Sequence, residues 1–348
     1  AYYGLASDRN AGSATTGTLS HVHRFGDASE LKTQVRQGAY ARDQRASSIR
    51  FAGQAATATN PLTNPAAVGL NNLGNATVLN RGTNNKIQDM DTLYLQSDYS
   101  TRFKQGGMSH EVLAGVDVAD ERFNNDTASL PAGVTLIKPQ TTLGTPADAA
   151  SVNESLRLLA SGRTFQAQAL GLYAQDLMQV TPDWKILGGL RWDRFRGRYW
   201  SAATTAANGR VTPAAVRERS DSVWSKRLGV LYQPTPLQSF HASWGTSFNT
   251  SGDTYQFDAL GSNTPPEGSR NIELGAKLDS ADKRFTTRLA LFHATKTNER
   301  NRDPDSASSA YLLSGKRHSA GFEIDITGRI TPRWEVYGSY AWTPIARI

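Results

Sequence analysis

The feature that most constrains the fold of this chain is a recurrent alternation of apolar and polar residues at every second position. It is clearest in WKILGGLRWD (184–193), FHASWGTSF (240–248), NIELGAKLDS (271–280) and GFEIDITGRI (321–330). Successive side chains of a strand point to opposite faces, so this period predicts β-strands with one apolar and one polar face. Several runs exceed the length of about five residues usual for a strand. Alternation alone fits both a soluble sheet over a core and a membrane barrel facing lipid.

The connections between these strands favour the membrane barrel. Short turn sequences and long polar segments rich in Asn, Thr, Ala, Gly and Pro follow one another strictly. The short turns centre on Gly26, Gly106, Pro182, Pro236, Asp282 and Pro332, and the long loops are expected at 43–88, 125–163, 201–216, 251–268 and 301–311. Short turns on one side and long loops on the other are typical of up-and-down outer-membrane barrels. We count about twelve strands on this basis.

Composition narrows the class of protein further. The formal net charge is +7 and the sequence pI is about 9.6, but the basic residues are dispersed rather than clustered with aromatic residues, which argues against nucleic-acid binding. No run approaches the roughly 18 apolar residues of a membrane-spanning helix. Cysteine is absent, which excludes disulfides, thiolate zinc sites and a cysteine nucleophile.

Motifs of catalysis are also missing from the 348 residues. The sequence contains no GxSxG elbow, no HExxH helix, no Walker-type loop and no GxGxxG turn, so we do not expect an enzyme. His21 and His23 share one strand face but lack a nearby third ligand, and DPDS (303–306) lacks the glycine and glutamate of a calcium-binding EF-hand loop. No metal site is therefore expected.

Several longer stretches resemble a known family. ALGLYAQDLMQVTPDWKILGGLRWDRF (169–195) is similar to a mid-barrel hairpin of TonB-dependent siderophore receptors, with a GLYxQD strand, a short turn and a GGxRxD strand. PPEGSRNIELGAKLD (265–279), LFHATKTNERNRDPD (291–305) and the SGKR, GxE and TPRW motifs within 312–342 resemble the strands that follow. The opening hairpin resembles the catecholate branch, and the resemblance covers nearly the whole chain apart from the long loops.

The resemblance implies a 22-stranded barrel with a plugged lumen in the bacterial outer membrane. Residues 1–348 are then expected to be a partial barrel domain of about twelve antiparallel transmembrane strands, without the plug domain and the closing C-terminal strands. The implied function is binding of a ferric catecholate siderophore for TonB-energised iron uptake. Expected partners are the siderophore, outer-membrane lipid and lipopolysaccharide, and the TonB complex through the absent plug. The resemblance implies a monomer and no cofactor, with iron present only in the siderophore.

Residues for siderophore binding follow from the chemistry of the implied ligand. A ferric tris-catecholate is anionic and carries flat aromatic rings, so its receptor needs cations for charge pairing and aromatic faces for stacking. Such residues occur at the expected long-loop ends of the strands, and the candidate set is Arg198, Tyr199, Trp200, Arg217, Tyr255, Arg300 and Arg302. The alternative for each arginine is contact with lipopolysaccharide phosphates, or simple solvation.

Two other classes of protein remain open from the residues. A soluble secreted all-β binding module, of the carbohydrate-binding or adhesin-like kind, predicts shorter strands and an aromatic stripe on one exposed face, and the strand lengths argue against it. A general-diffusion porin shares the barrel architecture. Long loops that carry arginine and aromatic residues favour a ligand-binding receptor over a porin.

Overall fold

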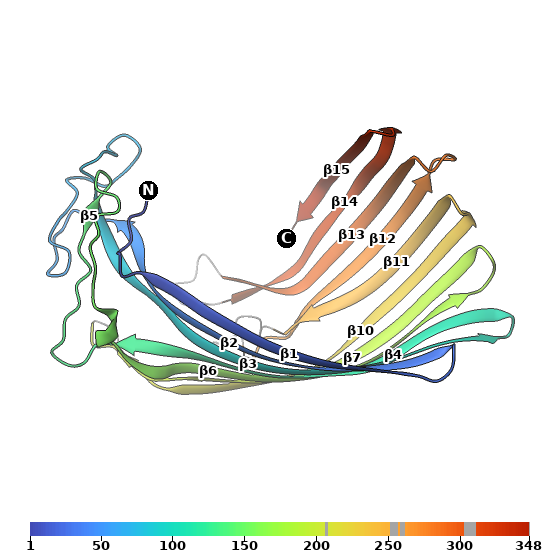
Figure 1. Cartoon of the computed structure of the whole chain (residues 1–348), viewed down its shortest axis with the longest axis horizontal. Helices are drawn as coiled ribbons and strands as arrows, with labels where there is room; N and C mark the ends of the chain where they lie inside the picture. The colour runs from blue at the N-terminus through green and yellow to red at the C-terminus, as the bar shows by residue number, and fades with distance from the viewer. Residues whose placement is uncertain (206–207, 251–256, 258–261, 303–310, 348) are drawn as a thin grey trace.

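The fold is a single antiparallel sheet bent into an open trough, seen in a computed structural model of the chain (Figure 1). The structure describes residues 1–205, 208–250, 257, 262–302 and 311–347, without the side chains of 300–302 and 311–315. Its long strands are β1 (Arg9–Arg24), β2 (Ser29–Phe51), β3 (Val78–Gln105), β4 (Met108–Ser129), β6 (Leu158–Gln179), β7 (Trp184–Ser201), β10 (Ala215–Thr235), β11 (Gln238–Asn249), β12 (Glu267–Asp279), β13 (Phe285–Arg302), β14 (Tyr311–Thr331) and β15 (Trp334–Arg347). The twelve predicted strands are confirmed in the described part of the chain.

Each long strand pairs with its neighbours in sequence, which is the topology of an up-and-down barrel. Strands β1 and β15 form the two edges of the sheet, so the chain folds as a segment of a barrel. The short β5 (Thr141–Thr142) pairs with β3, and β8 (Thr204–Thr205) pairs with β9 (Val211–Thr212). The one-turn 3₁₀ helix η1 (Glu154–Leu156) lies in the β4–β6 loop. No helix in the described ranges is both long enough and apolar enough to span a membrane.

One face of the sheet carries an apolar belt. On β7 this face presents Trp184, Ile186, Leu190 and Trp192, and the strand register places apolar side chains of β6 and β10 beside them. These side chains stay exposed: Leu190 is 53% and Trp224 59% accessible. Apolar side chains that are this exposed in a continuous belt are covered by another apolar medium. The belt therefore faces lipid.

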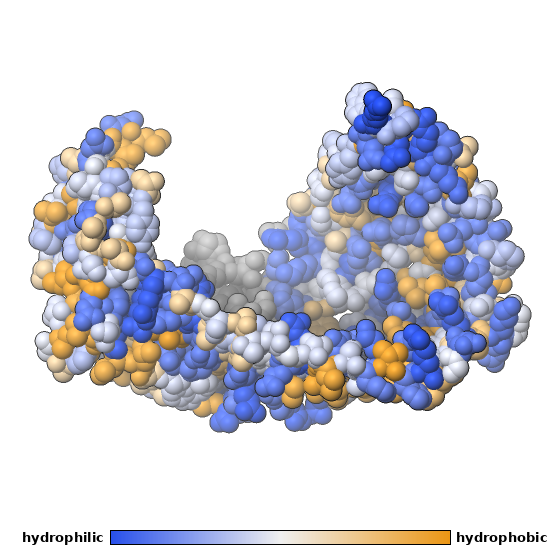
Figure 2. All heavy atoms as spheres, viewed as in Figure 1, coloured by the Kyte–Doolittle hydropathy of each residue, from blue (hydrophilic) through white to orange (hydrophobic). Residues whose placement is uncertain are grey.

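The other face is polar and lies on the inside of the trough. The Arg191 guanidinium on β7 donates to both carboxylate oxygens of Asp117 on β4, at 2.6 and 3.0 Å, and to Asp193 at 2.6 to 2.9 Å. Strand β6 lies between β4 and β7, so the Arg191–Asp117 pair bridges an intervening strand. Side chains converge in this way on the concave side of a curved sheet. The hollow of the trough is visible in the space-filling view (Figure 2).

Glycine on β6 makes room for this bridge. A Cβ added at Gly171 would overlap the Arg191 guanidinium and lie 2.7 Å from an Asp117 oxygen. Gly115 does the same for the Tyr173 ring, whose hydroxyl donates to Asp98. On the concave face, long side chains that lie over glycines therefore link strands that are not direct neighbours.

Aromatic side chains flank the short turns, as the pattern predicts. Trp184 stacks on Tyr232 with ring centroids 4.5 Å apart, and Phe103 stacks on His110 at 4.9 Å. These rings lie on the apolar face, where amphipathic aromatic groups mark the boundary between hydrocarbon and water. The short turns accordingly lie at one membrane boundary and the long loops beyond the other.

Several strands are longer than the sequence predicts. The expected loops 43–88 and 125–163 are wrong at their limits, because β2 runs to Phe51, β3 begins at Val78, β4 ends at Ser129 and β6 begins at Leu158. The added segments have polar residues on both faces, and so lack the alternation that identifies a strand in the membrane. Their backbones nevertheless continue the hydrogen-bonded ladder into water.

The long loops at this end are held by buried polar groups. Arg81 donates to the Tyr3 carbonyl at 2.7 Å and to the Pro139 carbonyl at 3.1 Å, and its Nη2 lies 2.8 Å from the Asp148 carboxylate. Asn64 bridges the ends of β2 and β3 by donating to the carbonyls of Ala52 and Val78. These contacts fasten the first residues of the chain and two loops to the sheet.

The Arg81–Asp148 pair predicts an acid-sensitive loop. The hydrogen bond from Arg81 lowers the pKa of the Asp148 carboxyl below its usual value, so the pair stabilises the fold above about pH 4 and is lost as the pH falls through the lowered pKa. We expect amide exchange in 139–150, corrected for its intrinsic pH dependence, to be steady from pH 8 to about pH 5 and to rise below pH 4. Asp148→Asn should show the faster exchange already at pH 7. Equal protection of parent and variant at every pH would contradict the assignment.

Candidate ligand-facing wall

The seven candidate ligand residues divide between the two faces of the sheet. Tyr199 on β7 lies directly opposite Arg217 on β10, and both belong to the concave face. Arg198 and Trp200 alternate with Tyr199 along β7 and lie on the convex face with the apolar belt. Neighbours along a strand point to opposite sides, so Arg198 and Trp200 lie on the other face of β7 from Tyr199, and the binding role of all three stays a prediction.

The side chains of the remaining three candidates lie outside the described part of the structure. Tyr255 lies outside the described residues. Arg300 and Arg302 lie in β13, paired with β14, and their side chains lie outside the described part of the structure. The concave wall that the structure describes around the candidate set is thus built on β4, β6, β7 and β10.

An aromatic cluster forms the centre of this wall near the long loops. Phe165 faces Tyr199 across the β6–β7 pair and is 1% exposed, while Tyr199 is 6% exposed. Phe257, from the connection between β11 and β12, packs edge-on against Phe165 with ring centroids 5.3 Å apart. Gly197 leaves space for the Phe257 ring, since a Cβ added at residue 197 would lie 2.8 Å from that ring.

A buried ion pair lies beside the aromatic cluster. The side chain of Arg219 is 2% exposed and its Nε lies 2.5 Å from the Asp221 carboxylate. Because i and i+2 share a strand face, Arg217, Arg219 and Asp221 form one polar column on β10. The Arg219–Asp221 pair is neutral as a whole, so the positive charge of this column is that of Arg217, which lies nearer the long loops.

Sequence reasoning missed Phe165, Phe257 and Arg219. Arg219 was detectable, because it follows Arg217 by two positions. Phe165 and Phe257 had no local signal, because both join the wall through contacts with residues far away in the sequence. Among the described residues no group of three potential metal ligands occurs. His21 and His23, both exposed on β1, stack with their ring centroids 6.3 Å apart.

Fold and wall together define a segment of a transmembrane β-barrel with an apolar exterior and a charged, aromatic interior near its long loops. Residues 1–347 match the family described as TonB dependent receptor-like, beta-barrel, and the chain belongs to this family. The predicted resemblance is thereby confirmed. These are receptors of the outer membrane and not enzymes, in agreement with the prediction that the chain has no catalytic role.

Curated relatives include named siderophore and metallophore receptors. The chain is 25% identical over 366 residues to the catecholate siderophore receptor Fiu of Escherichia coli K12, a match that covers 97% of this chain and 45% of the relative. It is 30% identical over 244 residues to the metal-pseudopaline receptor CntO of Pseudomonas aeruginosa, covering 68% of this chain and 32% of the relative. The chain thus spans about half the length of Fiu and about a third of the length of CntO.

Solved structures confirm the fold. The closed form of the ferric-catecholate import receptor Fiu from E. coli K12 superposes with a TM-score of 0.77 at 21% identity, over all of this chain and 50% of that one. The ferripyoverdine receptor of the P. aeruginosa outer membrane superposes with a TM-score of 0.69 at 16% identity, over 98% of this chain and 41% of that one. The sheet is therefore confirmed as a fragment of this receptor barrel.

Proposed function

We propose that the complete protein binds a ferric siderophore of the catecholate type and imports it with energy passed on by TonB. The proposal is supported by the Fiu relatives and by the charge of the concave wall. Its central observation is the pairing of Tyr199 with Arg217 on the concave face, at the end of the barrel where the long loops lie. A flat anionic catecholate complex needs a cation near aromatic rings, and Arg217 lies beside the aromatic cluster to which Tyr199 belongs.

The remaining partners belong to the same proposal. The plug domain would occupy the hollow of the trough and contact the concave charges, and the TonB complex would act through it. Pairing of β1 and β15 with further strands would close the complete barrel, which we take to be a monomer. Lipid and lipopolysaccharide would surround the convex face.

The test is equilibrium binding of a ferric tris-catecholate to the full-length receptor. Arg217→Gln is expected to weaken binding about tenfold, because a charge-assisted contact with an anion is worth roughly 1.5–3 kcal/mol. Arg198→Gln removes the same charge from the convex face of the neighbouring strand and is the matched control, with unchanged affinity expected. Equal affinities for Arg217→Gln and the parent would refute the role of Arg217, and loss in Arg198→Gln alone would reverse the assignment of faces.

A further inference from the structure

One asparagine of the chain stands in an exposed turn directly before a glycine. Among the 348 residues this Asn–Gly step occurs once, at Asn208–Gly209. It lies in the connection between β7 and β10, where β8 pairs with β9 and holds the ends of the turn together. Asparagine is chemically labile, because its side-chain amide can be attacked by the backbone nitrogen of the next residue. The local geometry of the turn decides whether this step is reactive.

The side chain of Asn208 is folded back over the residues that follow it. Its Oδ1 accepts a hydrogen bond from the Arg210 backbone N–H at 3.1 Å, which makes an Asx turn. The ring closed by this hydrogen bond contains both the Asn208 Cγ and the Gly209 nitrogen, so the two reacting atoms are held close together. The hydrogen bond also draws electrons toward Oδ1, which makes Cγ more electrophilic.

Gly209 leaves the line of attack open. Its φ is +78°, a left-handed conformation that glycine adopts without strain. Glycine has no side chain to shield its own nitrogen, and a Cβ added at this position would meet no atom of the described residues within 4 Å. Asn208 and Arg210 are exposed on either side of it. Water and hydroxide therefore reach the reacting atoms from solution.

We propose that Asn208 is a site of deamidation to isoaspartate in the folded receptor. The Gly209 nitrogen gives up its proton to hydroxide and attacks the Asn208 Cγ, and the side-chain amide nitrogen takes up a proton and leaves as ammonia. The product is a five-membered succinimide ring. Water then adds to one of its two carbonyl carbons and breaks the adjoining C–N bond. Opening at the main-chain carbonyl gives isoaspartate, with the backbone running through the former side chain, and opening at Cγ gives aspartate.

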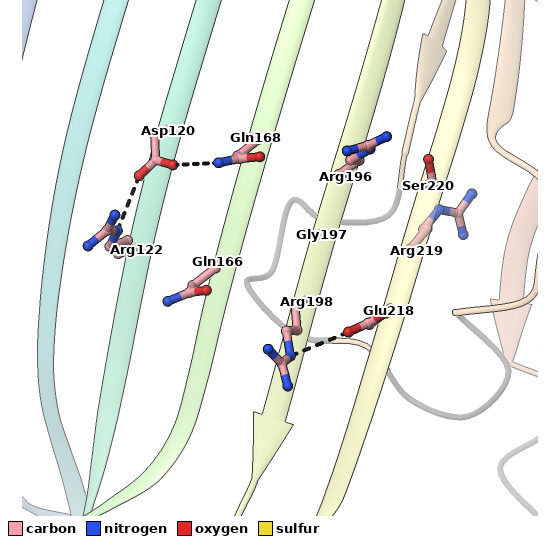
Figure 3. Close-up of a pocket in the computed structure, with 10 residues that line it drawn as sticks. All are labelled: Asp120, Arg122, Gln166, Gln168, Arg196, Gly197, Arg198, Glu218, Arg219 and Ser220. Carbon is pink, nitrogen blue, oxygen red and sulfur yellow. Dashed lines mark hydrogen bonds and ion pairs between the residues drawn. The ribbon is translucent and has the colours of Figure 1, made fainter.

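The modification changes the connection between two strands of the concave wall. Strands β7 and β10 lie side by side and are linked by the Arg198–Glu218 ion pair at 3.4 Å (Figure 3). Arg210 is the single charged residue of the connection 202–214, so a carboxylate at residue 208 cancels its charge. Isoaspartate also lengthens the backbone of the turn by one carbon atom. The inference concerns the chemistry of this turn and does not depend on siderophore transport.

The test follows residue 208 in the folded full-length receptor, kept in detergent at mildly alkaline pH for several days. Mass spectrometry of the tryptic peptide 199–210 should show a steady gain of about one dalton at residue 208, and isoaspartyl methyltransferase should label the same peptide. The rate should rise with the hydroxide concentration, because the attacking nitrogen must lose its proton. Asn153 is the internal control. Its Oδ1 accepts from the Ser155 N–H at 3.0 Å in the same way, but it precedes Glu154 and should stay intact.

Gly209→Ala is the matched variant, with its folding checked by heat-dependent gel mobility. Deamidation in it is expected to be about tenfold slower, because the added Cβ crowds the attacking nitrogen and alanine disfavours a φ of +78°. An unchanged rate in the folded variant would refute the part assigned to Gly209. The isolated peptide 199–210 is incubated alongside the receptor. If residue 208 stays intact in the receptor while the free peptide deamidates, the fold protects Asn208 and the proposal is wrong.

Discussion

Replacing Gly321 by alanine is expected to destabilise the complete barrel by about 3 kcal/mol. An added Cβ at this position in β14 would overlap the Trp342 carbonyl oxygen of β15 and lie 3.0 Å from the Thr343 Cα. Both are backbone groups, which cannot rotate away as a side chain can. The strand pairing shifts register at this point, between Ala320 and Phe322, so the close approach is part of the β14–β15 ladder. Overpacking of this kind costs at the upper end of about 1–3 kcal/mol.

The measurement is urea unfolding of the full-length receptor refolded into lipid vesicles. Gly338→Ala is the matched control, because Gly338 lies on the adjacent β15 and an added Cβ there meets no atom within 4 Å. The control should be unchanged, or slightly more stable through the smaller entropy of its unfolded chain. If both alanine variants unfold at the parent's urea concentration, β14 and β15 do not approach this closely in the complete barrel.

Replacing Lys138 by methionine is expected to release the β4–β6 loop from the sheet. The Lys138 side chain is 3% exposed, and its ammonium group lies 3.8 Å from Asp8 and 3.6 Å from Glu154. It also donates to the Ala46 carbonyl at 2.9 Å. Methionine fills similar space but removes the cation beside the buried Asp8 carboxylate and leaves Glu154 paired with Arg157 alone, and loss of one partner from a buried ion pair costs about 3–5 kcal/mol.

The effect of Lys138→Met should be local and large. Amide exchange in 130–157 of the full-length receptor is expected to accelerate more than about a hundredfold, while the strands in the membrane keep their protection. Lys86→Met, at an exposed position of β3, removes the same charge and should change nothing. Unaltered exchange in Lys138→Met would contradict the role of Lys138 in holding this loop to the sheet.

The two faces of each strand were predictable from the sequence. Ile272 and Leu274 alternate with Glu273 in the sequence. The structure places the two apolar residues on the apolar face and Glu273 on the polar face, as expected. Hydropathy with a period of two is a local property, because each residue's face depends only on its position in the strand. The strand count and the side of the short turns follow from the same local pattern, whereas the family resemblance rests on motifs such as those of 169–195.

Strand limits and residue partners depended on contacts that no local pattern carries. Polar extensions such as the end of β2 look like loops in sequence, since water rather than lipid surrounds both of their faces. Arg198 illustrates the same limit within the candidate site. Its residue type fits a siderophore or a lipid phosphate equally well, and only its face on β7 separates the two.

The sequence by itself thus determined an antiparallel barrel segment with one apolar face, because alternation and turn chemistry are local properties, and its motifs indicated the receptor family by resemblance. The tertiary structure decided which distant residues meet: Arg191 with Asp117, Arg81 with Asp148, and Phe165 with Tyr199. The physical reason is strand register. Each pairing joins residues far apart in the chain, and its alignment is set by the whole ladder of hydrogen bonds rather than by any one segment.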